Sequence, residues 1–97
     1  MTIDIKYEFI GWVNEGVHDK VYTVFNINNT YYSAWGRRGS KLQFKKLSGG
    51  YEAFSLMNKK QQKYKSVEEF LLFTFFPNFR EKVEEEVFMA TLSGKIR

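Results

Sequence analysis

Alternating apolar and polar positions run through the first half of the chain. Residues 3–10 alternate for most of their length, which is typical of a strand with one solvated face. Residues 21–27 and 30–35 are rich in β-branched and aromatic side chains, and residues 42–47 alternate again. Short turn signals separate these segments, namely Asn14-Glu15-Gly16, Asn28-Asn29 and Gly36 to Gly39. Four consecutive strands joined by short turns predict an antiparallel meander.

The second half of the chain changes to helical spacing. Apolar side chains recur along residues 51–65, which predicts a helix with a lysine-rich end. Ser66 and Glu69 have the spacing of a capping box, so a short aromatic helix is expected over residues 67–76. Another helix is expected from Phe79 onward. Because helices follow strands without alternation, the predicted class is α+β, a four-stranded antiparallel meander sheet followed by two or three helices packed on it.

Length and composition indicate one soluble domain over residues 1–97. Hydrophobic residues make up 43% of the chain and aromatic residues 19%, which is enough for a core. The chain has no cysteine, so disulfides and thiolate chemistry are excluded. The longest apolar run, over residues 70–76, is too short to cross a bilayer, and the amino terminus lacks the features of a signal peptide. We therefore expect a cytoplasmic protein that does not enter the membrane.

Positive charge is concentrated in the middle of the chain. Residues 35–65 carry nine lysines and arginines against the single acid Glu52, a balance of +8. Residues 1–34 carry two bases and four acids, and residues 66–97 carry four bases and six acids, so each flank has a balance of −2. A basic block of this kind attracts polyanions, which makes nucleic acid the expected partner.

Side chains suited to catalysis or metal binding are scarce. His18 is the only histidine, there is no cysteine, and the run Glu84–Glu86 is typical of a solvated helix face. The Gly36 to Gly39 segment connects two strands, whereas a phosphate-binding loop leads into a helix. We therefore expect a non-enzymatic protein without a metal or cofactor. An enzymatic role is left open only for a subunit that completes another chain's site.

Aromatic rings, glycines and cations are combined in residues 31–41. Arginine pairs with phosphate through two hydrogen bonds, a tryptophan ring stacks on a base or sugar, and glycine lets the main chain approach a ligand. The candidate nucleic-acid-binding residues are Trp35, Gly36, Arg37, Arg38, Lys41, Lys45 and Lys46, with Lys59, Lys60 and Lys63 adding charge. The alternative interpretation is that Trp35 packs in the core, the glycines only form turns, and the arginines are solvated.

Tyr31-Tyr32 followed by Trp35-Gly36-Arg37-Arg38-Gly39 resembles the signature of the WGR domain family. The resemblance extends over residues 3–65, which leaves residues 66–97 as a C-terminal helical extension. WGR domains occur in DNA-dependent poly(ADP-ribose) polymerases and in small bacterial proteins. The resemblance implies binding to DNA rather than RNA, near strand ends, with Trp35 against a terminal sugar and Arg37 on a phosphate or a partner domain. No transferase domain accompanies the motif, so polymerase activity is not implied.

Phenylalanines crowd residues 70–79. They either close the core over one face of the sheet or leave part of the cluster exposed as a surface for a protein partner or a second copy. The candidates for such a surface are Phe70, Phe73, Phe76 and Phe79. The second functional hypothesis is therefore a protein–protein interaction module, an adaptor or an inhibitor.

Overall fold

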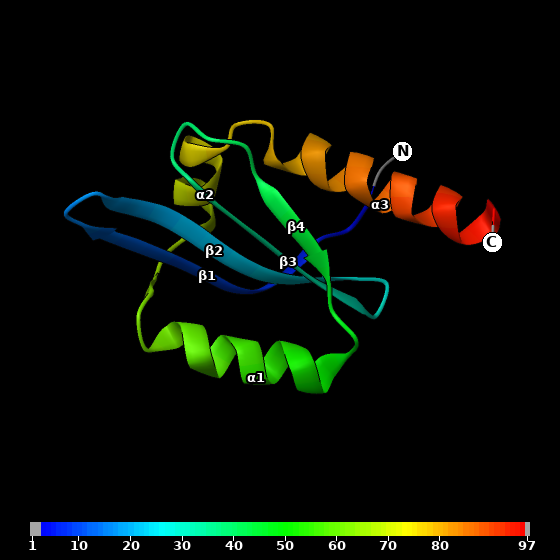
Figure 1. Cartoon of the computed structure of the whole chain (residues 1–97), viewed down its shortest axis with the longest axis horizontal. Coiled ribbons are helices and arrows are strands. Elements are labelled where there is room, and N and C mark those ends of the chain that lie inside the picture. The colour runs from blue at the N-terminus through cyan, green and yellow to red at the C-terminus, as the bar shows by residue number, and fades with distance from the viewer. Residues whose placement is uncertain (1–2, 97) are drawn as a thin grey trace.

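The computed structural model describes residues 3–96, with side chains to Met89, and confirms the predicted α+β class (Figure 1). Five strands and three helices lie within these residues. In chain order they are β1 (Lys6–Glu15), β2 (His18–Ile27), β3 (Thr30–Arg37), β4 (Gln43–Lys46), α1 (Gly50–Gln61), β5 (Lys65–Ser66), α2 (Glu69–Phe75) and α3 (Phe79–Ile96).

The strands form one antiparallel sheet in the order β4-β3-β2-β1-β5. Its first four strands are the predicted meander. Asn28 and Asn29 form the turn between β2 and β3 with φ angles of 50° and 66°, a conformation that asparagine tolerates better than most residues. This two-residue turn pairs Ile27 with Thr30 and so sets the register of the whole β2–β3 ladder.

Helices cover both faces of the sheet. Helix α1 lies against one face, and α2 and α3 lie against the other (Figure 1). The α1-side core contains Phe9, Val13, Tyr22, Val24, Leu47, Ala53 and Tyr64. The α2/α3-side core contains Ile10, Val21, Phe25, Ile27, Tyr32, Ala34, Leu72, Phe75, Phe79 and Val83. The C-terminal segment thus supplies four of the buried side chains that close the second face.

The boundary between α1 and α2 differs from the one expected. Helix α1 ends at Gln61, and Lys65 and Ser66 pair with β1 as a fifth strand. The N–H of Val67 then donates a hydrogen bond to the carbonyl of Ile10, which extends the pairing. Ser66 therefore does not cap α2, and Glu68, the residue before the helix, makes no capping hydrogen bond with its side chain. Pairing with the free backbone groups at the edge of β1 therefore determines the conformation of this segment more strongly than its capping-box spacing does.

Gly11 in β1 allows the closest approach in the α1-side core. A Cβ atom at this position would lie 2.6 Å from the Cζ atom of Phe9 and 2.6 Å from the Cβ atom of Tyr64. We expect Gly11→Ala to lower the free energy of unfolding by about 1–3 kcal/mol, because the added methyl group overpacks this site. Urea denaturation measures the change. The control is Gly49→Ala, where the backbone is extended and no atom lies within 4 Å of the added group; equal stability of the two variants would contradict the expected clash.

Candidate nucleic-acid interface

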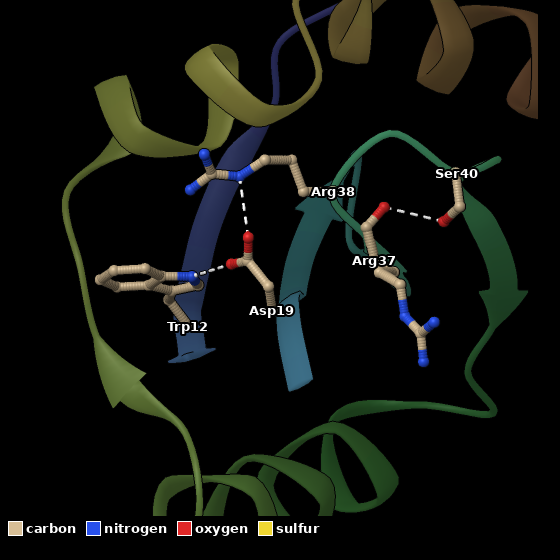
Figure 2. Close-up of polar contacts among 5 residues, drawn as sticks. All are labelled: Trp12, Asp19, Arg37, Arg38 and Ser40. Carbon is tan, nitrogen blue, oxygen red and sulfur yellow. Dashed lines mark hydrogen bonds and ion pairs between the residues drawn. The ribbon is translucent and has the colours of Figure 1, made fainter. Parts of the chain in front are cut away.

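The predicted binding residues fall on two faces of the sheet. Because side chains alternate along β3, Trp35 and Arg37 lie on the α1 side and Gly36 lies on the α2/α3 side. The guanidinium groups of Arg37 and Arg38 point in different directions (Figure 2). The predicted lysines divide in the same way, with Lys45 on the α1 side and Lys41 and Lys46 on the α2/α3 side. The structure therefore does not bring the whole predicted set into one patch.

Trp35 is partly exposed at the edge of the α1-side core. Its ring stacks on that of Tyr22, with centroids 5.5 Å apart and an interplanar angle of 15°. Tyr22 in turn contacts Tyr64, with centroids 5.7 Å apart. The three rings form a row across the sheet in which Trp35 is the outermost member. Trp35 therefore packs against the core and also keeps accessible aromatic surface.

Lys60 of α1 lies over this aromatic row. Its Nζ atom is 4.7 Å from the ring centroid of Tyr22 and 5.9 Å from that of Tyr64, which is within cation–π range. Burial against these rings lowers the pKa of Lys60 from its ordinary value. Nearby positive charges lower this pKa further, and they belong to Lys59, Lys63 and Lys20. The C-terminal end of α1 thus carries several cations close together.

Lys20 is a candidate binding residue that the sequence prediction missed. It lies in β2 directly opposite Arg37 in β3, so the two cations are cross-strand neighbours on the α1 side. Within the described part of the chain, neither side chain forms an ion pair. The surface that we call the basic patch consists of Lys20, Trp35, Arg37 and Lys60, with Lys59 and Lys63 beside them. The asparagine turn could have identified Lys20 from the sequence, because the strand register that this turn sets pairs residue 20 with residue 37.

Arg38 connects the sheet to α2. Its Nε atom lies 3.0 Å from the Oδ2 atom of Asp19, and its guanidinium carbon lies 4.0 Å from the ring centroid of Phe75. The indole N–H of Trp12 donates a hydrogen bond of 2.8 Å to the Oδ1 atom of Asp19 (Figure 2). The backbone N–H of Arg38 also donates to the carbonyl of Asp19. One carboxylate thus links β1, β2 and the end of β3, and it neutralises the Arg38 charge.

Removal of the Asp19 carboxylate is expected to destabilise the fold. Asp19→Ala leaves the indole N–H of Trp12 and the guanidinium of Arg38 without their shared acceptor, so we expect a loss of about 1–2 kcal/mol in the free energy of unfolding. Chemical denaturation followed by tryptophan fluorescence gives the value. Glu15→Ala removes the same charge from an exposed position of β1 and is the matched control, with an expected change within about 0.5 kcal/mol. If both variants match the unsubstituted protein, Asp19 has no structural role.

Gly36 and Lys45 also have structural contacts. A Cβ atom at Gly36 would lie 3.0 Å from the Cζ atom of Phe76, so glycine at this position admits that ring. The Nζ atom of Lys45 lies 3.4 Å from the Oε2 atom of Glu52. Glu52 also accepts a hydrogen bond from the N–H of Ser48, and this bond, ahead of Lys45, lowers the pKa of Glu52. Lys45 is thus partly neutralised beside the start of α1.

The phenylalanines proposed as a partner surface are mostly covered. Phe79 is fully buried and contacts Phe25 and Tyr7, with ring centroids 5.9 Å and 6.1 Å away, so it belongs to the core and not to an exposed surface. Phe73 and Phe76 are partly buried against the same core. Phe70 is the exposed member of the group, with an exposed fraction of 69%. Buried positions on α2 follow the helical repeat, and Phe70 lies outside the side of the helix that faces the sheet.

A pocket of about 390 Å³ lies on the α2/α3 side, between the loop after β3 and the start of α3. Its apolar wall includes Phe44 and Phe76, and Lys41 stands at its rim. The rim also contains Lys82 and Glu85, so its charge is mixed. Lys41 therefore lies apart from the basic patch, in the lining of a pocket that also contains the carboxylates of Glu85 and Glu86.

Comparisons of the chain with protein-family models, with curated proteins and with solved structures gave no match. Within the described residues, no group of three or more His, Asp or Glu side chains is placed to hold a metal ion. None of the described helices is long and apolar enough to span a membrane.

Proposed function

We propose that this protein is a small non-enzymatic module that binds nucleic acid, DNA in preference to RNA, through the basic patch. The observation that supports the proposal is the convergence of Lys20, Arg37 and Lys60, none of them in an ion pair within the described residues, beside the partly exposed ring of Trp35. Like charges held this close together destabilise a fold, and a polyanion would offset that cost.

The side chains of the basic patch are suited to different contacts with a nucleic acid. Arg37 is suited to a bidentate contact with phosphate, whereas Lys20 and Lys60 act as point charges along a backbone. The Trp35 ring is suited to stacking on a base or a terminal sugar, which agrees with the WGR resemblance and its preference for strand ends. The patch lies over a sheet and the end of a helix, and no helix of the described chain presents a set of base-reading side chains. We therefore expect binding that depends on charge and strand structure rather than on sequence.

A salt titration of binding is the direct test of this function. Blunt duplex, nicked duplex and single-stranded DNA are titrated over a range of salt concentrations, with single-stranded RNA for comparison. If the patch neutralises about four phosphates, log K for duplex is expected to fall with log salt with a slope of roughly −3 to −4. A slope near zero on every substrate would contradict the proposal.

Trp35→Ala separates stacking on a ligand from packing in the protein. We expect a loss of about 1–3 kcal/mol in binding free energy, because the accessible ring face disappears. The lost contact with Tyr22 is expected to lower the free energy of unfolding by only about 1 kcal/mol, so the variant still folds. Fluorescence anisotropy measures binding and thermal denaturation measures folding, with Trp35→Phe as the ring-retaining control. Unchanged affinity with reduced stability would show that Trp35 serves packing alone.

A further inference from the structure

Aromatic rings form most of the apolar wall of the pocket on the α2/α3 side. Its lining includes the rings of Phe44, Phe75, Phe76 and Phe79. Phe75 and Phe79 are buried, and Phe76 lies against Gly36, where an added Cβ atom would be 3.0 Å from the Cζ atom of the ring. Phe44 and Phe76 are only partly buried, so their rings are accessible from the pocket. Such a wall suits an aromatic ligand, because aromatic rings pack favourably edge to face or offset.

Charged side chains of both signs surround the rim of this pocket. Lys41 comes from the loop between β3 and β4, and Lys82, Glu85 and Glu86 come from the first two turns of α3. All four side chains are exposed, and within the described residues none of them takes part in an ion pair. The rim therefore offers two positive and two negative groups that do not pair with one another.

Helix α3 places a cation before an anion along the pocket. At about 100° per residue, Lys82 and Glu86 are about 40° apart around the helix axis and lie on the same side as the buried ring of Phe79. Glu86 is one turn, or about 6 Å, beyond Lys82 along the axis. A lysine four residues before a glutamate is the less favourable orientation for an ion pair on a helix, which agrees with the absence of a bond between these two side chains in the described chain.

We propose that this pocket binds a free aromatic amino acid in its zwitterionic form. The ring of the ligand packs against Phe44 and Phe76. Its carboxylate points toward Lys82 and Lys41, and its ammonium group points toward Glu86. The pocket volume of about 390 Å³ is within the range of about 300–1,000 Å³ that is usual for small-molecule sites.

The balance of charge at the rim is the reason for choosing a zwitterion. A ligand with a single charge would be attracted by one pair of rim groups and repelled by the other, whereas a zwitterion matches both pairs. An aromatic residue at the end of a peptide keeps only one of its two charged groups. The free amino acid is therefore the aromatic ligand that uses the whole rim.

The pocket is separate from the basic patch. It lies on the α2/α3 side of the sheet, whereas Lys60 of the basic patch belongs to α1 on the other side (Figure 1). No residue of the basic patch lines the pocket. The proposal therefore does not rest on nucleic-acid binding.

An NMR titration that follows the backbone amides tests this site. With L-phenylalanine, the amide signals of Leu42, Asn78 and Lys82 shift with one shared Kd on the order of 1 mM, and those of Lys20 and Lys60 do not shift. N-acetyl-L-phenylalanine lacks the ammonium group and L-phenylalaninamide lacks the carboxylate, and each binds about 3–5-fold more weakly. L-alanine lacks the ring and gives no saturable shift.

Variants of α3 assign the two charged ends of the ligand. Lys82→Gln weakens L-phenylalanine about 3-fold but does not weaken L-phenylalaninamide, because that probe has no carboxylate to lose a partner. Glu86→Gln weakens L-phenylalanine to a similar extent but does not weaken N-acetyl-L-phenylalanine. Glu81→Gln is the matched control, since it removes a charge from an exposed position of the same helix outside the pocket lining, and it leaves all three affinities unchanged.

Each of these substitutions is at an exposed position, so the fold is retained, and unchanged amide signals away from the pocket verify it. The proposal is overturned if L-phenylalanine shifts no amide of the pocket lining or if L-alanine binds equally well. It is also overturned if either blocked derivative binds as tightly as L-phenylalanine, which would be the behaviour of a site for the end of a peptide.

Discussion

Phe79→Ala is expected to lower the free energy of unfolding by about 3–5 kcal/mol, the usual cost of removing a fully buried phenylalanine ring. Phe79 has no exposed surface, and its ring lies among those of Phe25, Tyr7 and Phe73. Small domains have total stabilities of about 5–15 kcal/mol, and this chain is near the low end of domain size. The variant is therefore expected to melt at least about 12 °C lower, at about 4 °C or more per kcal/mol.

Urea denaturation measures this loss, with tryptophan fluorescence as the signal. Trp12 is a suitable reporter because its ring contacts Phe75 of α2 edge to face, with centroids 5.9 Å apart. Phe70→Ala is the matched control, since it makes the same substitution at an exposed position of α2 and is expected to change stability by no more than about 0.5 kcal/mol. Similar values for the two variants would show that α3 does not pack on the sheet through Phe79.

The sheet could be predicted from the sequence because its determinants are local. Alternation along each strand and the asparagine pair at residues 28 and 29 define a hairpin without reference to the rest of the chain. The segment at Lys65 and Ser66 shows the limit of this approach. Its spacing also fits a helix cap, and its true partner, the edge of β1, lies more than fifty residues earlier in the chain. Local pattern carries no information about such a pairing.

The candidate site was only partly predictable for a related reason. Composition shows that the middle of the chain is basic, but neighbouring residues on a strand point to opposite faces, as Lys45 and Lys46 do. Lys20 lies outside the basic segment, and only the register of the hairpin places it beside Arg37. Neutralisation of Arg38 depends on Asp19 in β2, and its cation–π contact depends on α2 lying over that face. Both contacts depend on the tertiary structure and cannot be inferred from local sequence.

The triple variant Lys20→Gln, Arg37→Gln and Lys60→Gln is expected to bind duplex DNA roughly 100-fold more weakly at low salt, because three phosphate contacts are lost. The same loss makes the dependence of log K on log salt shallower by about 2–3. Folding is expected to be retained, since the substitutions remove a partly buried positive charge and the like-charge repulsion around it, and burial followed by this repulsion lowers the pKa of Lys60. Salt-dependent anisotropy titrations and a thermal melt of the same sample measure both effects.

The control for this variant must remove the same charge from elsewhere. Lys41→Gln, Lys46→Gln and Lys82→Gln also takes three positive charges from a net charge of +4, but these lysines lie on the α2/α3 side. If the basic patch binds the polyanion, the control keeps most of the affinity, because interactions across the domain are screened over about 8–10 Å at physiological salt. Equal losses in the two triple variants would mean that binding follows overall charge, and the convergence of cations beside Trp35 would then have no part in it.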